Sequence, residues 1–404
     1  MRLHMEDNMR QTYRILPVYS GDVSGVCSAL YELGGMVVMH DPSGCNSTYN
    51  THDETRWYDH DSLIFLSGLC EPDAIMGNDD KFIDDVIRAA AACSPAFIAL
   101  CNSPVPYLTG TDFAGISAVI EVRTGIPVFY VPTNGMHDYI SGAGMAWERL
   151  ARKWFGEDKN RPAHAGSCPG APKVSVLGMT PLDFAAAGCG DALQKVLREG
   201  GFAAGPVWAM GSSLREIEKT PSADVNLVVS ASGLPLAKYL HRRFGTPWTA
   251  GLPLPGHTGG VFRSIEEAVD SGSCGCAYMR DLPEGSCACT APEVIVIGEP
   301  VSACSIAYVC ESKGLTTRVI AATEGSEDLI RPGDLVCRGE EETENALSGL
   351  CRPGTRVLAD PMYERICPAG TDFIPIPHLA FSGRVYRSRF MNLFEAETAR
   401  GIFG

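Results

Sequence analysis

Three cysteines in the first quarter of this 404-residue chain stand where a metal cluster could be held. Cys27 and Cys45 flank an apolar segment, and small or turn-forming residues precede each of them. Such residues let the backbone approach an inserted object closely and aim amide N–H groups at sulfide. Cys101 ends the apolar run AFIALC, at the carboxyl end of an expected strand, where α/β sheets place their sites. These three thiols are candidate ligands of an iron–sulfur cluster.

The competing interpretation is ordinary packing, because cysteine is among the most buried residue types and behaves as a small hydrophobe. The three positions are far apart, and none belongs to a ferredoxin-like CxxCxxC run. A second group, CGC at 274–276 and CAC at 287–289, supplies four thiols within sixteen residues. Cys274, Cys276, Cys287 and Cys289 fit zinc or a small iron–sulfur cluster, but CxC pairs are less typical than CxxC. Both interpretations of this second group stay open.

Composition narrows the classes of protein. The sixteen cysteines occur in a large chain whose first residues lack the apolar core of a secretory signal, so we expect a cytoplasmic protein with reduced thiols. The formal charge of −15 argues against nucleic acid as a partner and favours basic protein partners. No stretch approaches the roughly 18 uncharged apolar residues of a membrane span.

Apolar runs of strand character alternate with helical patterns, which predicts an α/β fold with parallel sheets. The expected strands are 96–101, 127–131, 173–178, 225–230, 293–298 and 356–360, and the expected helices are 81–93, 140–155, 188–199, 234–244 and 301–313. The Pro- and Gly-containing stretch 156–173 is typical of a linker. We therefore expect three domains: 1–160 with the cluster cysteines, 173–250, and 251–404 with a C-terminal helix.

Several segments, in order, resemble the nitrogenase component 1 family, whose relatives reduce tetrapyrroles or assemble cofactors. HDPSGC is similar to the family's His-Gly-Pro-x-Gly-Cys, with Asp41 in place of the usual glycine. Further similar segments are EPDAIMGN (71–78), CNSPVPYLTGTD (101–112), PVFYVPTNGMHDYISGAGMAWERL (127–150), VNLVVSASGLPLAKYLHRRFGTPW (225–248) and IPIPHLAFSGRVY (374–386). The resemblance implies three Rossmann-like parallel-sheet domains.

The same resemblance implies that Cys27, Cys45 and Cys101 bind the electron-relay cluster between two subunits. A [4Fe–4S] cluster needs four ligands. A chain offering three must therefore borrow one from its partner or share a larger cluster of the P-cluster type, with Cys70 as a possible additional ligand. The implied partners are a second copy or a sister component 1 subunit, and an ATP-dependent iron protein that supplies electrons.

The implied function is a nitrogenase-like oxidoreductase with an unidentified substrate, and the alternative is a scaffold for assembly or delivery of a metallocluster. A cluster-free α/β binding protein is the third possibility. Nitrogenase anchors its active-site metal cofactor with a cysteine near the position of Ser230, and serine replaces a soft thiolate poorly. Dinitrogen reduction at a molybdenum–iron cofactor is therefore not expected. The catalytic residues cannot be named from the sequence.

Overall fold

The computed structural model describes residues 14–16, 20–42, 54–57, 59–156, 170–256, 258–280, 289–325 and 327–403. Cys45, Cys287 and most of the expected linker lie outside these ranges. Within them, every helix is too short or too polar to cross a membrane.

The first domain is built on a parallel four-stranded sheet of order β2-β1-β3-β4. Its strands are β1 (Met36–His40), β2 (Leu63–Leu66), β3 (Ile98–Asn102) and β4 (Val128–Val131). Its helices are α1 (Asp22–Leu30), α2 (Glu71–Met76), α3 (Asp79–Cys93), α4 (Pro104–Thr109), α5 (Phe113–Thr124) and α6 (Tyr139–Phe155). Side chains alternate across a strand, so Met36 and Val38 pack with α3 and α5, whereas Val37 and Met39 pack with α1 and α6.

The second domain has a parallel sheet of order β6-β5-β7-β8-β9. Its strands are β5 (Lys173–Leu177), β6 (Ala203–Val207), β7 (Val225–Val228), β8 (Trp248–Ala250) and β9 (Gly275–Cys276). Its helices are α7 (Cys189–Glu199), α8 (Leu214–Ile217), α9 (Leu234–Phe244) and α10 (Thr258–Ser271), with short 3-10 turns η2 (Thr220–Ser222), η3 (Ala231–Gly233) and η4 (Ala277–Met279). The proposed boundary after residue 250 cuts this sheet between β8 and β9, so strand pairing favours a boundary after Cys276.

The third domain has a parallel sheet of order β12-β11-β10-β13-β14. Its strands are β10 (Val294–Gly298), β11 (Thr317–Ala321), β12 (Leu335–Val336), β13 (Arg356–Ala359) and β14 (Asp372–Pro375). Its helical segments are α11 (Pro300–Ser312), α12 (Glu340–Leu350), η6 (Pro361–Ile366), α13 (Leu379–Ser382), η7 (Gly383–Arg389) and α14 (Ala396–Phe403). Phe394 stacks on Phe184, so the C-terminal segment returns to the second domain.

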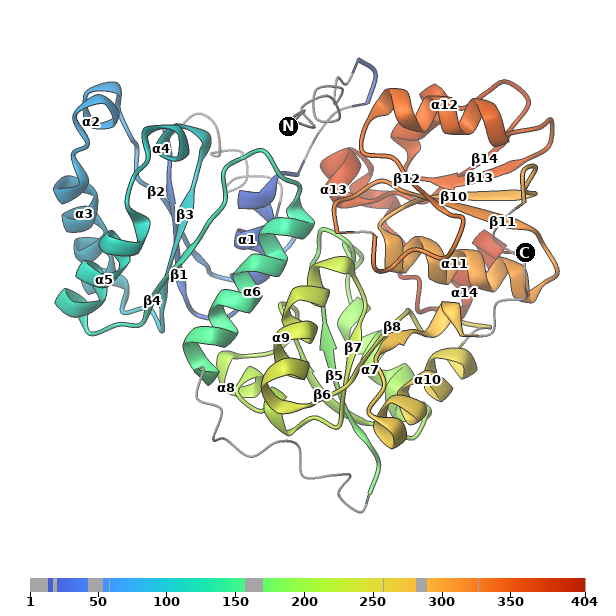
Figure 1. The fold of residues 1–404 in the computed structure, drawn as a ribbon, viewed down its shortest axis with the longest axis horizontal. Coiled ribbons are helices and arrows are strands. Elements are labelled where there is room, and N and C mark those ends of the chain that lie inside the picture. Colours follow the sequence, from blue (N-terminus) through green and yellow to red (C-terminus); the bar gives the residue numbers. More distant parts are fainter. Residues whose placement is uncertain are drawn as a thin grey trace, which may run out of the picture.

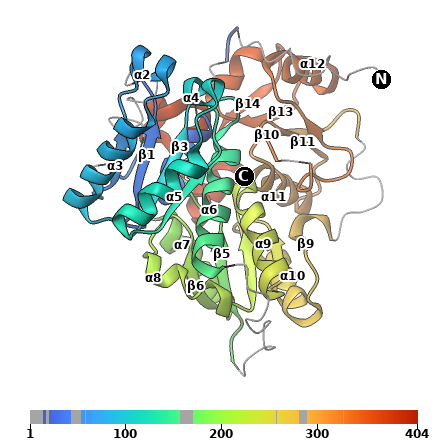
Figure 2. The ribbon, with the colours of Figure 1, turned by 60° about the vertical axis from the view of Figure 1, so that its left-hand side comes forward.

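The three domains form three lobes around a common centre (Figure 1), and the view turned by 60° keeps α6 near that centre (Figure 2). Helix α6 packs on α1 and β4 of the first domain and on α9 and η3 of the second. The Asp138 side chain caps α6 by accepting hydrogen bonds from the amides of Ile140 and Ser141. The expected α/β class with three parallel sheets is confirmed.

Candidate functional site

Cys27 and Cys101 come together on one face of the first sheet. Cys101 lies on β3 beside Met39 of β1, and the Cys27 Sγ on α1 is 3.9 Å from the Met39 Sδ. Both thiols are fully buried, and neither is in a disulfide. The segment that leads from β1 toward Cys45 leaves the sheet at the same carboxyl edge. The structure therefore brings two of the three expected ligands together, and the third lies outside the described residues.

The electrostatic surroundings keep both thiols protonated when no metal is bound. Burial raises the pKa of Cys27, and the charge of Glu54 raises it further. Burial also raises the pKa of Cys101 well above its ordinary value, and the charges of Cys27 and Asp22 add to this. A bound cation reverses this effect, because it stabilises the thiolate directly. Two buried, convergent, soft donors fit iron, although no three His, Cys, Asp or Glu side chains within the described ranges could hold a metal ion.

Cys70 is in a different environment. It is exposed at the N-cap of α2, and its Sγ is hydrogen-bonded to the Asp73 Oδ2 at 2.9 Å. Hydrogen bonds from Cys70, Lys81 and Asn78 lower the pKa of Asp73. In the second cysteine group, Cys276 is buried on β9, whereas Cys274 and Cys289 are half-buried. Its fourth member lies outside the described residues.

A buried arginine fixes the segment beyond Cys45 against α1. The Arg56 guanidinium donates to both carboxylate oxygens of Glu54, to Glu32 and to the backbone carbonyl of Ser28, which follows Cys27. It also donates to the backbone carbonyl of Ala209 in the second domain at 2.7 Å. Arg56 therefore ties the neighbourhood of Cys27 to the second domain.

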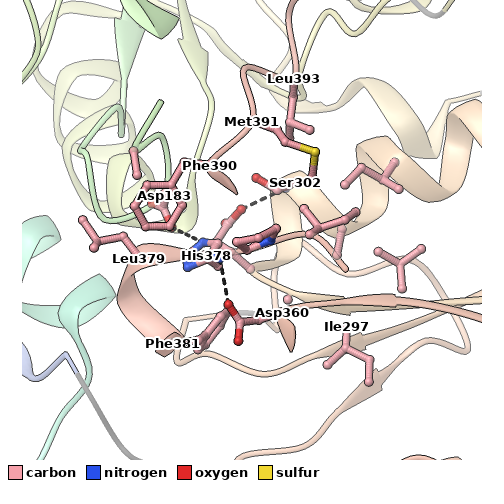
Figure 3. Close-up of a pocket in the computed structure, with 18 of the residues that line it drawn as sticks. Asp183, Ile297, Ser302, Asp360, His378, Leu379, Phe381, Phe390, Met391 and Leu393 are labelled. Atoms are coloured by element: carbon pink, nitrogen blue, oxygen red, sulfur yellow. Dashed lines mark hydrogen bonds and ion pairs between the residues drawn. The ribbon is translucent and has the colours of Figure 1, made fainter. Parts of the chain in front are cut away.

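A second set of chemical groups lies where the three domains meet (Figure 3). The Tyr139 hydroxyl of the first domain donates to the Asp183 Oδ1 of the second at 2.5 Å. The same oxygen is 3.2 Å from the His378 Nε2 of the third domain. The Asp183 side chain is fully buried, and its Oδ2 and the His378 Nδ1 have no hydrogen-bond partner within the described ranges. Both unpartnered atoms belong to residues that line a small cavity of about 50 Å³.

Two further carboxylates line this cavity. Glu299 follows β10, and its carboxylate accepts from the amides of Val301 and Ser302 at the start of α11 and from Ala231 of the second domain. Asp360 follows β13 and accepts from the His378 amide and the Ser382 hydroxyl. A larger hollow of about 990 Å³ lies next to the cavity and shares four of its lining residues, Ala185, Ala186, Phe390 and Met391.

Sequence reasoning missed this second set. Asp183, Glu299 and Asp360 follow strands of two different sheets, and Tyr139 begins a helix of the first domain. One signal was available: an acid directly after an apolar strand, as in EVIVIGE and RVLAD, marks the edge at which α/β sheets bind ligands. Nothing in the sequence indicated that three domains would bring these acids into one cavity.

The fold and the site define a class: a three-domain protein with Rossmann-like sheets, a buried thiol pair at one sheet edge and an acidic cavity between the domains. The model of the family described as nitrogenase component 1 type oxidoreductase matches residues 24–265, which is more than half of the chain. The chain belongs to this family.

The curated relatives are distant. The nitrogenase iron–molybdenum cofactor biosynthesis protein NifE of Klebsiella pneumoniae is 24% identical over 53% of this chain and 48% of its own length. The nitrogenase molybdenum–iron protein alpha chain of Azospirillum brasilense is 26% identical over 52% and 45%. One of the subunits of the light-independent protochlorophyllide reductase of Angiopteris evecta is 23% identical over 58% and 46%. The chain spans about half the length of the curated relatives it matches.

A solved structure, "Nitrogenase Cp1 at pH 6.5", aligns with 98% of this chain and 94% of its own, at a TM-score of 0.62 and 14% identity. At that identity the likeness bears on the fold alone. It agrees with the arrangement of three parallel sheets.

Proposed function

We propose that this chain is a subunit of a nitrogenase-like oxidoreductase that holds an iron–sulfur cluster at a subunit interface. Electrons would arrive from an ATP-dependent iron protein and pass through the cluster to a substrate between the three domains. The observation that carries this proposal is the convergence of Cys27 and Cys101 on the face of the first sheet from which the chain leads to Cys45.

The donor count favours an interface. A [4Fe–4S] cluster takes four ligands, so three thiolates from one chain leave a position for a group of the partner subunit, either a second copy or a sister chain. Cys70 is exposed on the same edge of the sheet and stays a candidate additional ligand.

An exposed apolar surface on the same side of the first domain is suited to the electron donor. We define the α2–α4 patch as Ile75, Met76, Tyr107 and Leu108, of which Met76 and Leu108 are 80% and 75% exposed. Helix α2 has no buried residue, so packing within the chain does not account for its apolar side chains. Acids adjoin the patch at Glu71 and Asp112. A second copy would set acid against acid, whereas a partner with basic groups around an apolar centre is complementary.

The alternative role is a scaffold on which a metallocluster is assembled or held for delivery. Ser230, near the position of the cofactor cysteine, is fully buried, and its hydroxyl is hydrogen-bonded to that of Ser232 at 3.0 Å. This side chain offers no soft ligand for a resident cofactor. The similarity to a cofactor biosynthesis protein supports the same alternative.

Anaerobic purification tests the proposal. The protein should be brown, and iron and sulfide analysis should give a multiple of four irons per dimer. Protein that stays colourless and free of iron after reconstitution with iron and sulfide would refute both cluster-based functions and leave an α/β binding protein. The analysis must exclude oxygen, because oxidation destroys exposed clusters.

A further inference from the structure

We propose that Glu299 and Asp183 hold a proton at the closed end of the hollow between the three domains and deliver it to a group that is reduced there. This inference rests on the proposed reductase function and adds the chemical class of its substrate: an unsaturated group that takes up protons with its electrons.

The geometry places acids together without a cation. The charged or titratable residues that line the cavity are Asp183, Glu299, Asp360 and His378, and no lysine or arginine is among them. Tyr139 adds a hydroxyl that already donates to Asp183. The Oδ2 of Asp183 has no donor within the described ranges, although its side chain is fully buried. A buried carboxylate without a cation is costly, and a shared proton removes much of that cost.

The electrostatics support a proton near neutral pH. Burial raises the pKa of Glu299 to about 7, the charge of Asp183 also raises it, and the amides of Ser302, Ala231 and Val301 oppose both effects. Burial and the charges of Asp183, Glu299 and Asp138 raise the pKa of Tyr139 well above its usual value, so this residue remains a hydrogen-bond donor. His378 faces the same Asp183 oxygen as Tyr139.

A route for protons adjoins the pair. The larger hollow of about 990 Å³ shares Ala185, Ala186, Phe390 and Met391 with the cavity, so only these side chains separate the two spaces. The cavity of about 50 Å³ has room for water between polar partners. Water in the larger hollow can therefore return a proton to Glu299 after each delivery.

The balance of the reaction requires such a group. Reduction of a double bond breaks the π bond, consumes two electrons and two protons, and forms two new bonds to hydrogen. The iron protein supplies the electrons through the cluster. The carboxyl pair supplies one proton for each delivery and recovers it from water. A site that only stores a metallocluster does not need this group.

Infrared spectroscopy of the protein labelled with ¹³C-glutamate tests the inference without a cluster or a substrate. At pH 6 we expect a labelled carboxylic acid band that disappears with a midpoint near pH 7, because Glu299 is the only glutamate of the described residues whose pKa is raised to that range. Glu299→Gln should remove this band. Asp183→Asn should move its midpoint to lower pH, since the charge of Asp183 no longer opposes ionisation.

Glu340→Gln is the matched control. Glu340 is also fully buried and accepts from three backbone amides. Its burial would raise its pKa, but the hydrogen bonds from Leu16, Ile15 and Arg14 outweigh that effect and lower the pKa. The band should therefore be unchanged in this variant.

The rate of exchange in D₂O tests delivery. The band should shift to the deuterated position within seconds if water reaches the pair through the larger hollow. A labelled protein without an acid band at pH 6, a band that survives in Glu299→Gln, or exchange that takes minutes would each overturn the inference. None of these results depends on iron, so they leave the test of the proposed function separate.

Discussion

Burial does not distinguish the cysteines of this chain, because Cys27, Cys101 and Cys310 are all buried. Their neighbours do distinguish them. Cys27 and Cys101 share one face of a sheet at its carboxyl edge, whereas Cys310 lies near the C-terminal end of α11. A soft anionic ligand and a small apolar side chain have different consequences when they are removed.

Cys45→Ala, Cys27→Ala and Cys101→Ala should each abolish or strongly deplete the cluster, because no neighbouring thiol replaces the one removed. Cys310→Ala should keep the iron and cost about 1 kcal/mol of packing. Iron content and visible absorption of the four proteins, prepared together without oxygen, provide the measurement. Equal iron in all four would mean that these thiols do not bind the cluster.

Arg56→Ala should lower the free energy of unfolding by about 3–5 kcal/mol, because Glu54 and Glu32 would remain buried without their cation. Urea unfolding at neutral pH measures the change. Lys153→Ala is the control, since its pair with Glu121 is partly exposed and worth less than about 1 kcal/mol. Similar losses in both variants would contradict the role of burial.

The residue types of the thiol site could be predicted from the sequence, and those of the junction could not. Cys27 and Cys101 were identified from loop context and from the resemblance, although Cys27 lies within helix α1 rather than in a turn. The junction acids depend on how three domains pack. Tyr139 and Asp183 are 44 positions apart and in different domains, so no local pattern records their contact.

At the scale of elements, the crossing of α1 and α6 positions both sites, since Cys27 is on one helix and Tyr139 begins the other. The helices approach closely at two glycines. A Cβ added at Gly142 would overlap the backbone of Asp22, and one added at Gly25 would overlap the backbone of Tyr139. The absence of side chains at these positions sets the distance between the helices.

Gly142→Ala should therefore destabilise the protein by about 3 kcal/mol or more and lower the iron content, because α1 must move away from α6. Gly349→Ala in α12 is the control, since a Cβ there meets no atom within 4 Å. It should be neutral or stabilising by about 0.5–1 kcal/mol. Thermal unfolding of both variants tests this, and an unchanged melting temperature for Gly142→Ala would contradict the close crossing.

The cap of α6 predicts a dependence on pH. Burial raises the pKa of Asp138 from 3.8 to about 7, the amide of Glu324 lowers it and the charge of Glu324 raises it. The unfolded chain ionises first as pH rises, so the contribution of Asp138 to stability is present below about pH 4 and is lost by about pH 7.

Asp138→Asn keeps an N-cap and removes this titration. Relative to the original protein, the variant should gain stability between pH 5 and pH 7 and no more above pH 8. Urea midpoints across this range provide the measurement. A difference that stays constant from pH 5 to pH 8 would show that Asp138 does not titrate there.

Strongly apolar strands and long helices were predictable, and short or less apolar strands were not. The runs that begin near 96, 127, 173, 225, 293 and 356 all correspond to strands, and α6 and α9 begin within one residue of their expected positions. Strands β6, β8 and β9 were missed. They are short or contain glycine and proline, and their pairing with neighbours, rather than their own propensity, makes them strands.

At the scale of the molecule, the α2–α4 patch distinguishes two kinds of contact. Met76→Asp combined with Leu108→Asp should weaken binding of the iron protein, because it places charge in the apolar centre of the contact. It should leave the subunit dimer and the iron content unchanged. Light scattering and iron protein pull-down measure the two effects. A fall to monomer mass would instead identify the patch as the subunit interface.

The position of His378 has a consequence for the order in which the protein matures. A nascent chain that has emerged as far as residue 350 already contains Cys27, Cys45 and Cys101, but His378 is still to be synthesised. The thiol edge is complete after the first domain, whereas the junction needs a residue from each of three domains. Metal loading can therefore begin during translation, while the acidic cavity closes only when the last domain has folded. Electrons that reach an unfinished chain find no assembled site for a substrate.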